Sequence, residues 1–207
     1  GALMHSCTLN RFLRQILPIL NLYGTNSIEY AYTLGFICHF ALDSYCHPYV
    51  IPAVKELNFA HIAMETEFDR YLMKGNGENP LSYPLQNLIP LDDKTKDCLH
   101  HIFPDIPEEV METCLKTYRF YRKLWVTPNK ANYWMKKAFF KTRPRSGYFC
   151  NFLMKEEPHP LAKKTNPELD KLYQEALDAA VSYLISFHQS FTGNEPLDQR
   201  FERNFKS

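Results

Sequence analysis

Glycine is scarce in this chain of 207 residues, which contains only 7 of them. So few glycines argue against a fold rich in tight turns. The 6 cysteines are scattered without a CxxC pair, so they resemble small buried residues more than a disulfide framework. A formal net charge of +1 gives no electrostatic argument for a nucleic acid or for a strongly anionic membrane. The longest apolar run, residues 30–42, is too short to span a bilayer, and we expect no transmembrane segment.

Aromatic residues are abundant, with 15 Phe, 13 Tyr and 2 Trp. The hydrophobic content of 45% and the charged content of 23% are typical of a soluble globular protein. A chain of this length can bury a sizeable core, and we expect one domain over residues 1–207.

Apolar residues recur at helical spacing along most of the chain, and strand-like alternation does not persist anywhere. The sequence therefore predicts an all-α, multi-helix fold. Asn26 and Glu29 form a capping-box pattern, and Pro48 disfavours helical geometry before it, so one helix should end near Tyr45. The other predicted helices cover residues 6–21, 57–73, 95–102, 130–139 and 167–191, and a further helix is predicted to begin at residue 105. In the last of these we expect an inward face of Leu169, Leu172, Leu177, Val181, Leu184, Phe187 and Phe191.

Potential metal ligands are concentrated between residues 39 and 65. His39, Asp43 and His47 follow one another at intervals of four, and so do His61 and Glu65. Residues four apart share one face of a helix, and imidazole and carboxylate groups suit zinc. His39 and His47 would lie about 12 Å apart along one helix, so a single ion is not expected to bind both. The spacing favours two ions, with Asp43 near both.

The alternative interpretation is that these histidines are core residues satisfied by the neighbouring carboxylates. Five such groups within 27 positions, two of them inside an apolar helix, favour a metal, because burying them without compensation is costly. Helix geometry also leaves Cys46 open as a ligand. Asp69, four residues after Glu65, could support that ligand, whereas Glu67 resembles a solvated surface carboxylate.

The segments GFICHFALDSYCHPY and HIAMETEFD resemble the bacterial zinc-dependent phospholipase C family. His39 and Asp43 match its HxxxD pair, His47 matches the histidine that follows, and His61 and Glu65 match its HxxxE pair. His5, in the opening Gly-Ala-Leu-Met-His, is similar to the upstream histidine of the family. The resemblance covers about residues 1–73, and the rest of the chain matches only in its all-α character.

The resemblance implies that His47, His61 and Glu65 hold one zinc ion. It implies that His5, His39 and Asp43 hold a second, with Asp43 also reaching toward a third. In the family, an aspartate upstream of the His5 position and the ligands that complete the third zinc would lie before Gly1. We therefore expect two zinc ions here and an incomplete third site.

The function implied is zinc-dependent hydrolysis of a phosphate ester, namely phospholipase C-type cleavage of a phospholipid by a metal-activated water. This implies a phospholipid or another phosphate-ester substrate and transient contact with a membrane surface. No residue is identifiable as the general acid. The alternatives are a zinc-dependent nuclease or nucleotidase, and a non-catalytic zinc-stabilised interaction domain. The scattered cysteines and the lack of a signal peptide favour the cytoplasm, with secretion as the alternative if the N-terminus was trimmed.

Overall fold

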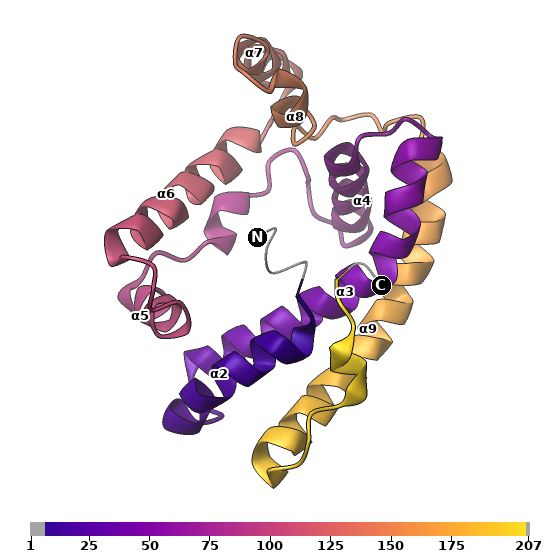
Figure 1. Cartoon of the computed structure of the whole chain (residues 1–207). Coiled ribbons are helices and arrows are strands. Elements are labelled where there is room, and N and C mark those ends of the chain that lie inside the picture. Colours follow the sequence, from indigo (N-terminus) through magenta and orange to yellow (C-terminus); the bar gives the residue numbers. More distant parts are fainter. Residues whose placement is uncertain (1–6, 206–207) are drawn as a thin grey trace. The chain divides into compact units, whose positions relative to one another are not determined.

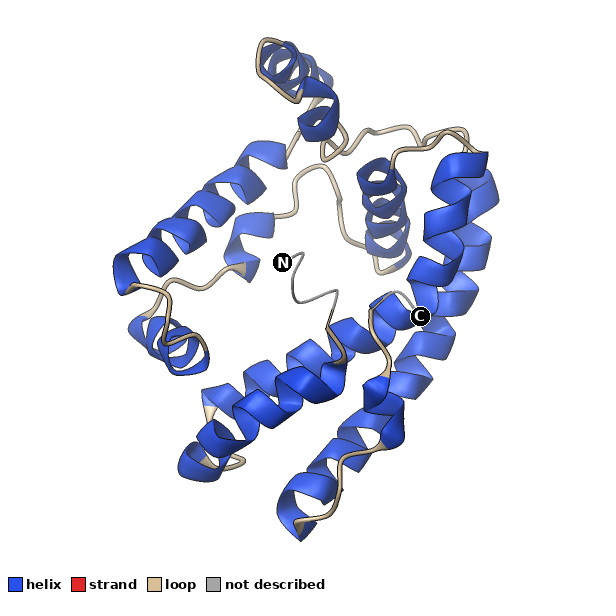
Figure 2. Ribbon diagram, viewed as in Figure 1, coloured by secondary structure: helices blue, strands red, loops and turns tan. Residues whose placement is uncertain are grey.

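A computed structural model describes residues 7–205 of the chain. Within these residues all regular structure is helical and no β-strand occurs (Figure 2), which confirms the predicted all-α fold. Figure 1 labels the α-helices α2 (Leu9–Tyr23), α3 (Ile28–Glu56), α4 (His61–Gly75), α5 (Asp93–Ile102), α6 (Glu108–Trp125), α7 (Lys130–Lys141), α8 (Ser146–Cys150) and α9 (Ala162–Gly193). Two short 3-10 helices, η1 (Leu85–Leu88) and η2 (Gln199–Glu202), complete the set. None of the described helices has the length and apolarity needed to cross a membrane.

The chain divides into two compact units. The first comprises Gly1–Tyr49, Asp92–Glu108 and Leu169–Ser207, and the second comprises Val50–Leu91 and Glu109–Glu168. The boundaries fall inside α3 and α9, so each of these helices contributes to both units. The expectation of one domain over the whole chain stays a prediction.

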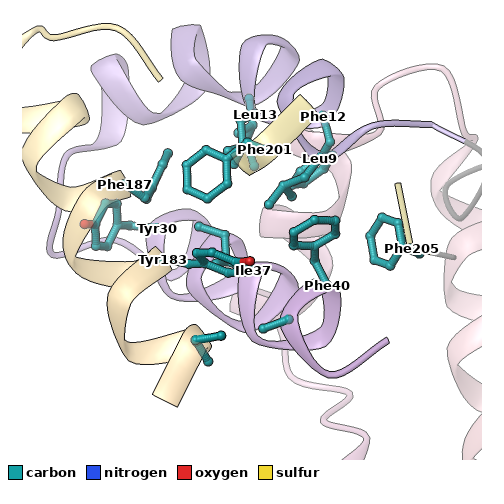
Figure 3. Close-up of a cluster of buried hydrophobic side chains, with 14 of the residues drawn as sticks. Leu9, Phe12, Leu13, Tyr30, Ile37, Phe40, Tyr183, Phe187, Phe201 and Phe205 are labelled. Carbon is teal, nitrogen blue, oxygen red and sulfur yellow. The ribbon is translucent and has the colours of Figure 1, made fainter. Parts of the chain in front are cut away.

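The core of the first unit is a cluster of aliphatic and aromatic side chains from α2, α3, α9 and the C-terminal segment (Figure 3). The spacing of its α2 members at Leu9, Leu13, Ile16 and Leu20 gives that helix one buried stripe. Pro18 lies inside α2 without ending it. The buried members of the cluster are Leu9, Phe12, Leu13, Ile16, Leu20, Tyr30, Ile37, Phe40, Ala41, Ala179, Ala180, Tyr183, Phe187, Phe201 and Phe205.

The start of α3 differs from the predicted capping box. Ser27, rather than Asn26, caps the helix, because its hydroxyl oxygen accepts a hydrogen bond from the backbone N–H of Tyr30 at 3.1 Å. The side chain of Glu29 hydrogen-bonds with Ser27 at the start of the helix. Its carboxylate accepts a hydrogen bond from His101 on α5, with 2.8 Å between the two atoms. Glu29 therefore makes a tertiary contact in addition to the local one.

The predicted end of α3 near Tyr45 is wrong, because the helix continues through Pro48 to Glu56. A proline inside a helix removes one backbone hydrogen bond and costs about 3 kcal/mol. Val50 and Ala53, beyond the proline, are almost fully buried. Burial of this later part of the helix offsets the local penalty.

The buried face of α9 differs in part from the inward face that the sequence predicted. Leu169 and Phe187 are buried as predicted, but Val181 is more than half exposed and Leu177 is also exposed. The small side chains Ala176, Ala179 and Ala180 are buried instead. Periodicity located the helix, but it did not identify the face on which small residues allow close packing.

In the second unit an aromatic cluster holds α6, α7 and α8 together. Phe140 of α7 is buried with Trp125 and Leu153, and Phe149 and Phe152 pack against them. The rings of Trp125 and Phe152 are stacked, with their centroids 4.0 Å apart. One face of α7 is therefore fixed to the rest of its unit.

Candidate metal centre

The first group of predicted ligands lies on α3, within the first unit. Nε2 of His39 is 3.6 Å from Oδ2 of Asp43, and Nδ1 of His47 is 3.8 Å from the same oxygen. Asp43 thus lies between the two histidines, as the spacing of four predicts. The side chain of His39 is 45% exposed and that of His47 only 9%, so His47 lies much deeper in the protein.

The orientation of His47 is set by the C-terminal segment. Its Nδ1 is 2.8 Å from the backbone carbonyl oxygen of Phe205. Because a carbonyl oxygen only accepts hydrogen bonds, Nδ1 must carry a proton, and in the neutral ring Nε2 is the nitrogen with the lone pair. Histidines that bind metals commonly donate their second ring N–H to such an oxygen. The arrangement suits His47 as a ligand through Nε2.

The second group lies on α4, within the second unit. Nε2 of His61 is 2.7 Å from Oε1 of Glu65, and both side chains are partly open to solvent. Helix α4 begins at His61 because Asn58, with a φ of 46°, turns the chain before it. The helix ends at Gly75, two residues beyond the predicted end at residue 73. Both donor groups are therefore at the start of the helix, on one face and one turn apart.

Both pairs have separations that suit zinc. Two ligand atoms on one tetrahedral zinc ion, each at about 2.0 Å, lie about 3.3 Å apart. The pair on α4 at 2.7 Å and the His39–Asp43 pair at 3.6 Å fall on either side of this value. Small side-chain rotations would bring either pair to the required separation. The proton shared by His61 and Glu65 would be released on metal binding.

Two other carboxylates on α4 differ in environment. Asp69 is exposed, but the protein groups around it displace water from its carboxylate and raise its pKa to about 6. The charge of Arg122 opposes this shift and that of Glu65 adds to it. The support of Glu65 by Asp69 stays a prediction. The interpretation of Glu67 as a solvated surface carboxylate is wrong. Glu67 is buried and accepts a hydrogen bond from Nε of Arg70 at 2.9 Å.

Two sequence candidates complete the set. His5 lies outside the residues that the structure describes, so its assignment stays a prediction. Cys46 is buried on α3, beside His47 in the sequence. The carbonyl of Phe205 is a functional group that the sequence did not reveal. It lies 158 residues from His47, and no local pattern signals such a contact.

A comparison with known families finds one match. A family model described as zinc-dependent phospholipase C matches residues 3–127, which is more than half of the chain. The matched region contains all the predicted ligands, His5, His39, Asp43, His47, His61 and Glu65, and it ends before α7. Neither the curated proteins nor the solved structures give a match.

Proposed function

Because the chain belongs to the zinc-dependent phospholipase C family, we propose that it hydrolyses a phospholipid at the bond between glycerol and phosphate. The family as a whole is zinc dependent and has a phospholipase C-like function. The observation that carries the proposal is the position of the ligand pairs, which lie on two helices inside the matched region.

The proposal assigns one zinc ion to His47, His61 and Glu65, the set that the resemblance of the sequence to the family implies. The tautomer of His47 supports this assignment, because the Phe205 carbonyl leaves Nε2 as the coordinating nitrogen. The short separation of the donor atoms of His61 and Glu65 also supports it. A second ion would be held by His39 and Asp43 together with His5.

Bound zinc supplies Lewis acidity, which polarises a phosphoryl oxygen and lowers the pKa of a water molecule. The residues of the chain hold and orient the ligand atoms. Asp43 presents one carboxylate between two histidines, so its negative charge serves both sites. The Phe205 carbonyl restrains the imidazole ring of His47.

The experiment that tests this proposal is the zinc content per chain of desalted protein, measured by elemental analysis. We expect about two zinc ions in the natural protein and fewer in His61→Ala. The matched control is His100→Ala, which removes an exposed histidine of α5 that belongs to neither ligand pair. It should keep the full zinc content.

Activity is then measured as release of diacylglycerol from phosphatidylcholine micelles. Loss of a metal ligand should lower this rate by at least roughly 100-fold, whereas His100→Ala should match the natural protein. A chain without zinc, or with a zinc content that His61→Ala leaves unchanged, would overturn the proposed ligands. Cleavage of single-stranded DNA without phospholipid hydrolysis would indicate a nuclease. One tightly held zinc without activity would indicate an interaction domain.

A further inference from the structure

Helix α7 presents an exposed apolar face that the metal centre does not explain. The side chains of Trp134, Met135 and Phe139 are 61%, 62% and 45% exposed. Ala131 and Ala138 are exposed as well. At about 100° per residue, these five positions fall within an arc of about 140° on one side of the helix. We call this arc the α7 apolar face.

The opposite side of α7 fixes the helix to the second unit. Phe140 is buried in the aromatic cluster, and the ammonium group of Lys136 donates a hydrogen bond to the carbonyl oxygen of Val126. Asn129 caps the helix by accepting a hydrogen bond from the backbone N–H of Asn132 at 2.8 Å. The α7 apolar face is thus held outward on a helix that is anchored elsewhere. An exposed apolar surface of this kind commonly marks an interaction site.

The sequence segment that contains α7 is strongly basic, although the chain as a whole is nearly neutral and Glu156 and Glu157 follow the segment directly. Residues 113–155 contain 11 basic side chains and no acidic one. The other 164 residues contain 13 basic and 23 acidic side chains. The net charge of +1 therefore conceals a basic segment within an otherwise acidic chain. A partner for α7 should carry negative charge.

Cations lie directly beside the exposed rings. The ammonium group of Lys137 is 4.7 Å from the ring centroid of Trp134, and the guanidinium group of Arg143 is 4.8 Å from that of Phe139. Lys141, at the end of the helix, is exposed. This combination of aromatic and apolar residues with flanking cations is typical of helices that lie in a membrane interface.

We infer that the α7 apolar face docks the protein on an anionic phospholipid surface. Trp134, Met135 and Phe139 would enter the interface between headgroups and acyl chains. Lys137, Lys141 and Arg143 would lie against the lipid phosphates. A lipid fits better than a nucleic acid, because Met135 and the two alanines offer apolar contact rather than a stacking platform. The inference rests on the proposed function, because that function makes a phospholipid the substrate. Docking itself is measured in assays that do not depend on hydrolysis.

The test is flotation of the full chain with vesicles. One set contains phosphatidylcholine alone, and the other contains two thirds phosphatidylcholine and one third phosphatidylglycerol. We expect binding to the anionic vesicles that weakens by at least roughly fivefold on neutral vesicles or in about 0.5 M salt, because screening removes the electrostatic part. The double variant Met135→Ser/Phe139→Ser should bind the anionic vesicles at least roughly 10-fold more weakly.

The matched control is Val181→Ser/Ile185→Ser on α9. It removes two exposed apolar side chains, also four residues apart, from a helix segment of the first unit. This control should bind the vesicles like the natural protein. Since both double variants change exposed positions, equal urea midpoints will show that each remains folded.

Tryptophan fluorescence gives a second measurement, because the chain has only two tryptophans. Trp125 is buried and Trp134 is exposed. A blue shift on anionic vesicles should come from Trp134 and disappear in Trp134→Phe, which retains an aromatic ring for binding.

Several outcomes would overturn the inference. These are no binding to anionic vesicles, equal binding by the α7 variant and its α9 control, or binding of single-stranded DNA in place of vesicles. Failure of the proposed function is distinguishable from failure of docking. Vesicle binding without hydrolysis would contradict the hydrolase and leave the docking surface in place. Hydrolysis of a soluble short-chain phospholipid without vesicle binding would contradict docking alone.

Discussion

Replacement of Phe205 by alanine should weaken both the first unit and its hold on zinc. The ring of Phe205 is almost fully buried, and its centroid lies 5.2 Å from that of Phe40 and 5.4 Å from that of Phe36. The backbone carbonyl of the same residue accepts the hydrogen bond from His47. Packing of the ring therefore determines where this oxygen lies. Removing the ring should release the segment and, with it, the imidazole.

The two expected effects have different magnitudes. Truncation of a fully buried phenylalanine costs about 3–5 kcal/mol of unfolding free energy. Loss of the hydrogen-bond partner of a metal-bound histidine typically lowers metal affinity by about 10- to 100-fold.

Stability is measured by urea unfolding of the apoprotein in excess chelator, and zinc affinity by competition with a chromophoric chelator. The control is Phe201→Ala. Phe201 is as deeply buried in the same cluster and packs on Tyr183, with centroids 5.7 Å apart, but no hydrogen bond joins it to His47 in the described structure. The Phe201→Ala variant should lose a similar amount of unfolding free energy and retain most of its affinity for zinc. If both variants bind zinc as tightly as the natural protein, the carbonyl of Phe205 does not orient a ligand.

Two further predictions concern the fold of the first unit. His101→Ala should lower the unfolding free energy, measured in urea, by about 2 kcal/mol, because the buried carboxylate of Glu29 loses one of its hydrogen-bond donors. The control is His100→Ala at the exposed neighbouring position, which should change the unfolding free energy by less than about 0.5 kcal/mol. Hydrogen bonds from Arg200 lower the pKa of Asp198 to about 2. This folded-state pKa lies below the unfolded-state pKa of about 3.9. The carboxylate therefore contributes its full stabilisation above about pH 3.9 and loses it as the pH falls toward 2. Asp198→Asn should therefore lower the unfolding free energy by about 1 kcal/mol at pH 7, after allowance for the partial exposure of Arg200. The difference in urea midpoint between the variant and the natural protein should shrink below pH 4. A difference that stays constant down to pH 2 would contradict this reasoning.

The all-α class, the approximate positions of most helices and the spacing of the ligand pairs could be read from the sequence. Each depends on residues a few positions apart. His39 and Asp43 share a helix face because of the helical repeat, and the same holds for His61 and Glu65. The short helix α5 was predicted over residues 95–102; it begins two residues earlier, at Asp93, where Asp92 caps it by accepting a hydrogen bond from the N–H of Thr95.

Tertiary structure decided the features that depend on distant parts of the chain. Helix α3 passes through Pro48 because its later turns are buried, which no local rule could anticipate. The tautomer of His47 depends on the carbonyl of Phe205, which folding brings to it from 158 residues away. Glu67 and Arg70 pair locally on α4, but the packing of the second unit decides that both are buried.

The same division explains the α7 apolar face. The sequence specifies a helix with aromatic, apolar and basic residues, and periodicity alone would assign its apolar side to a core. Folding instead buries Phe140 and leaves Trp134 and Met135 outside. Local sequence determines which residues share a helix face, because that follows from the helical repeat. Only the packed chain determines which face is covered, because burial depends on residues that the local pattern does not contain.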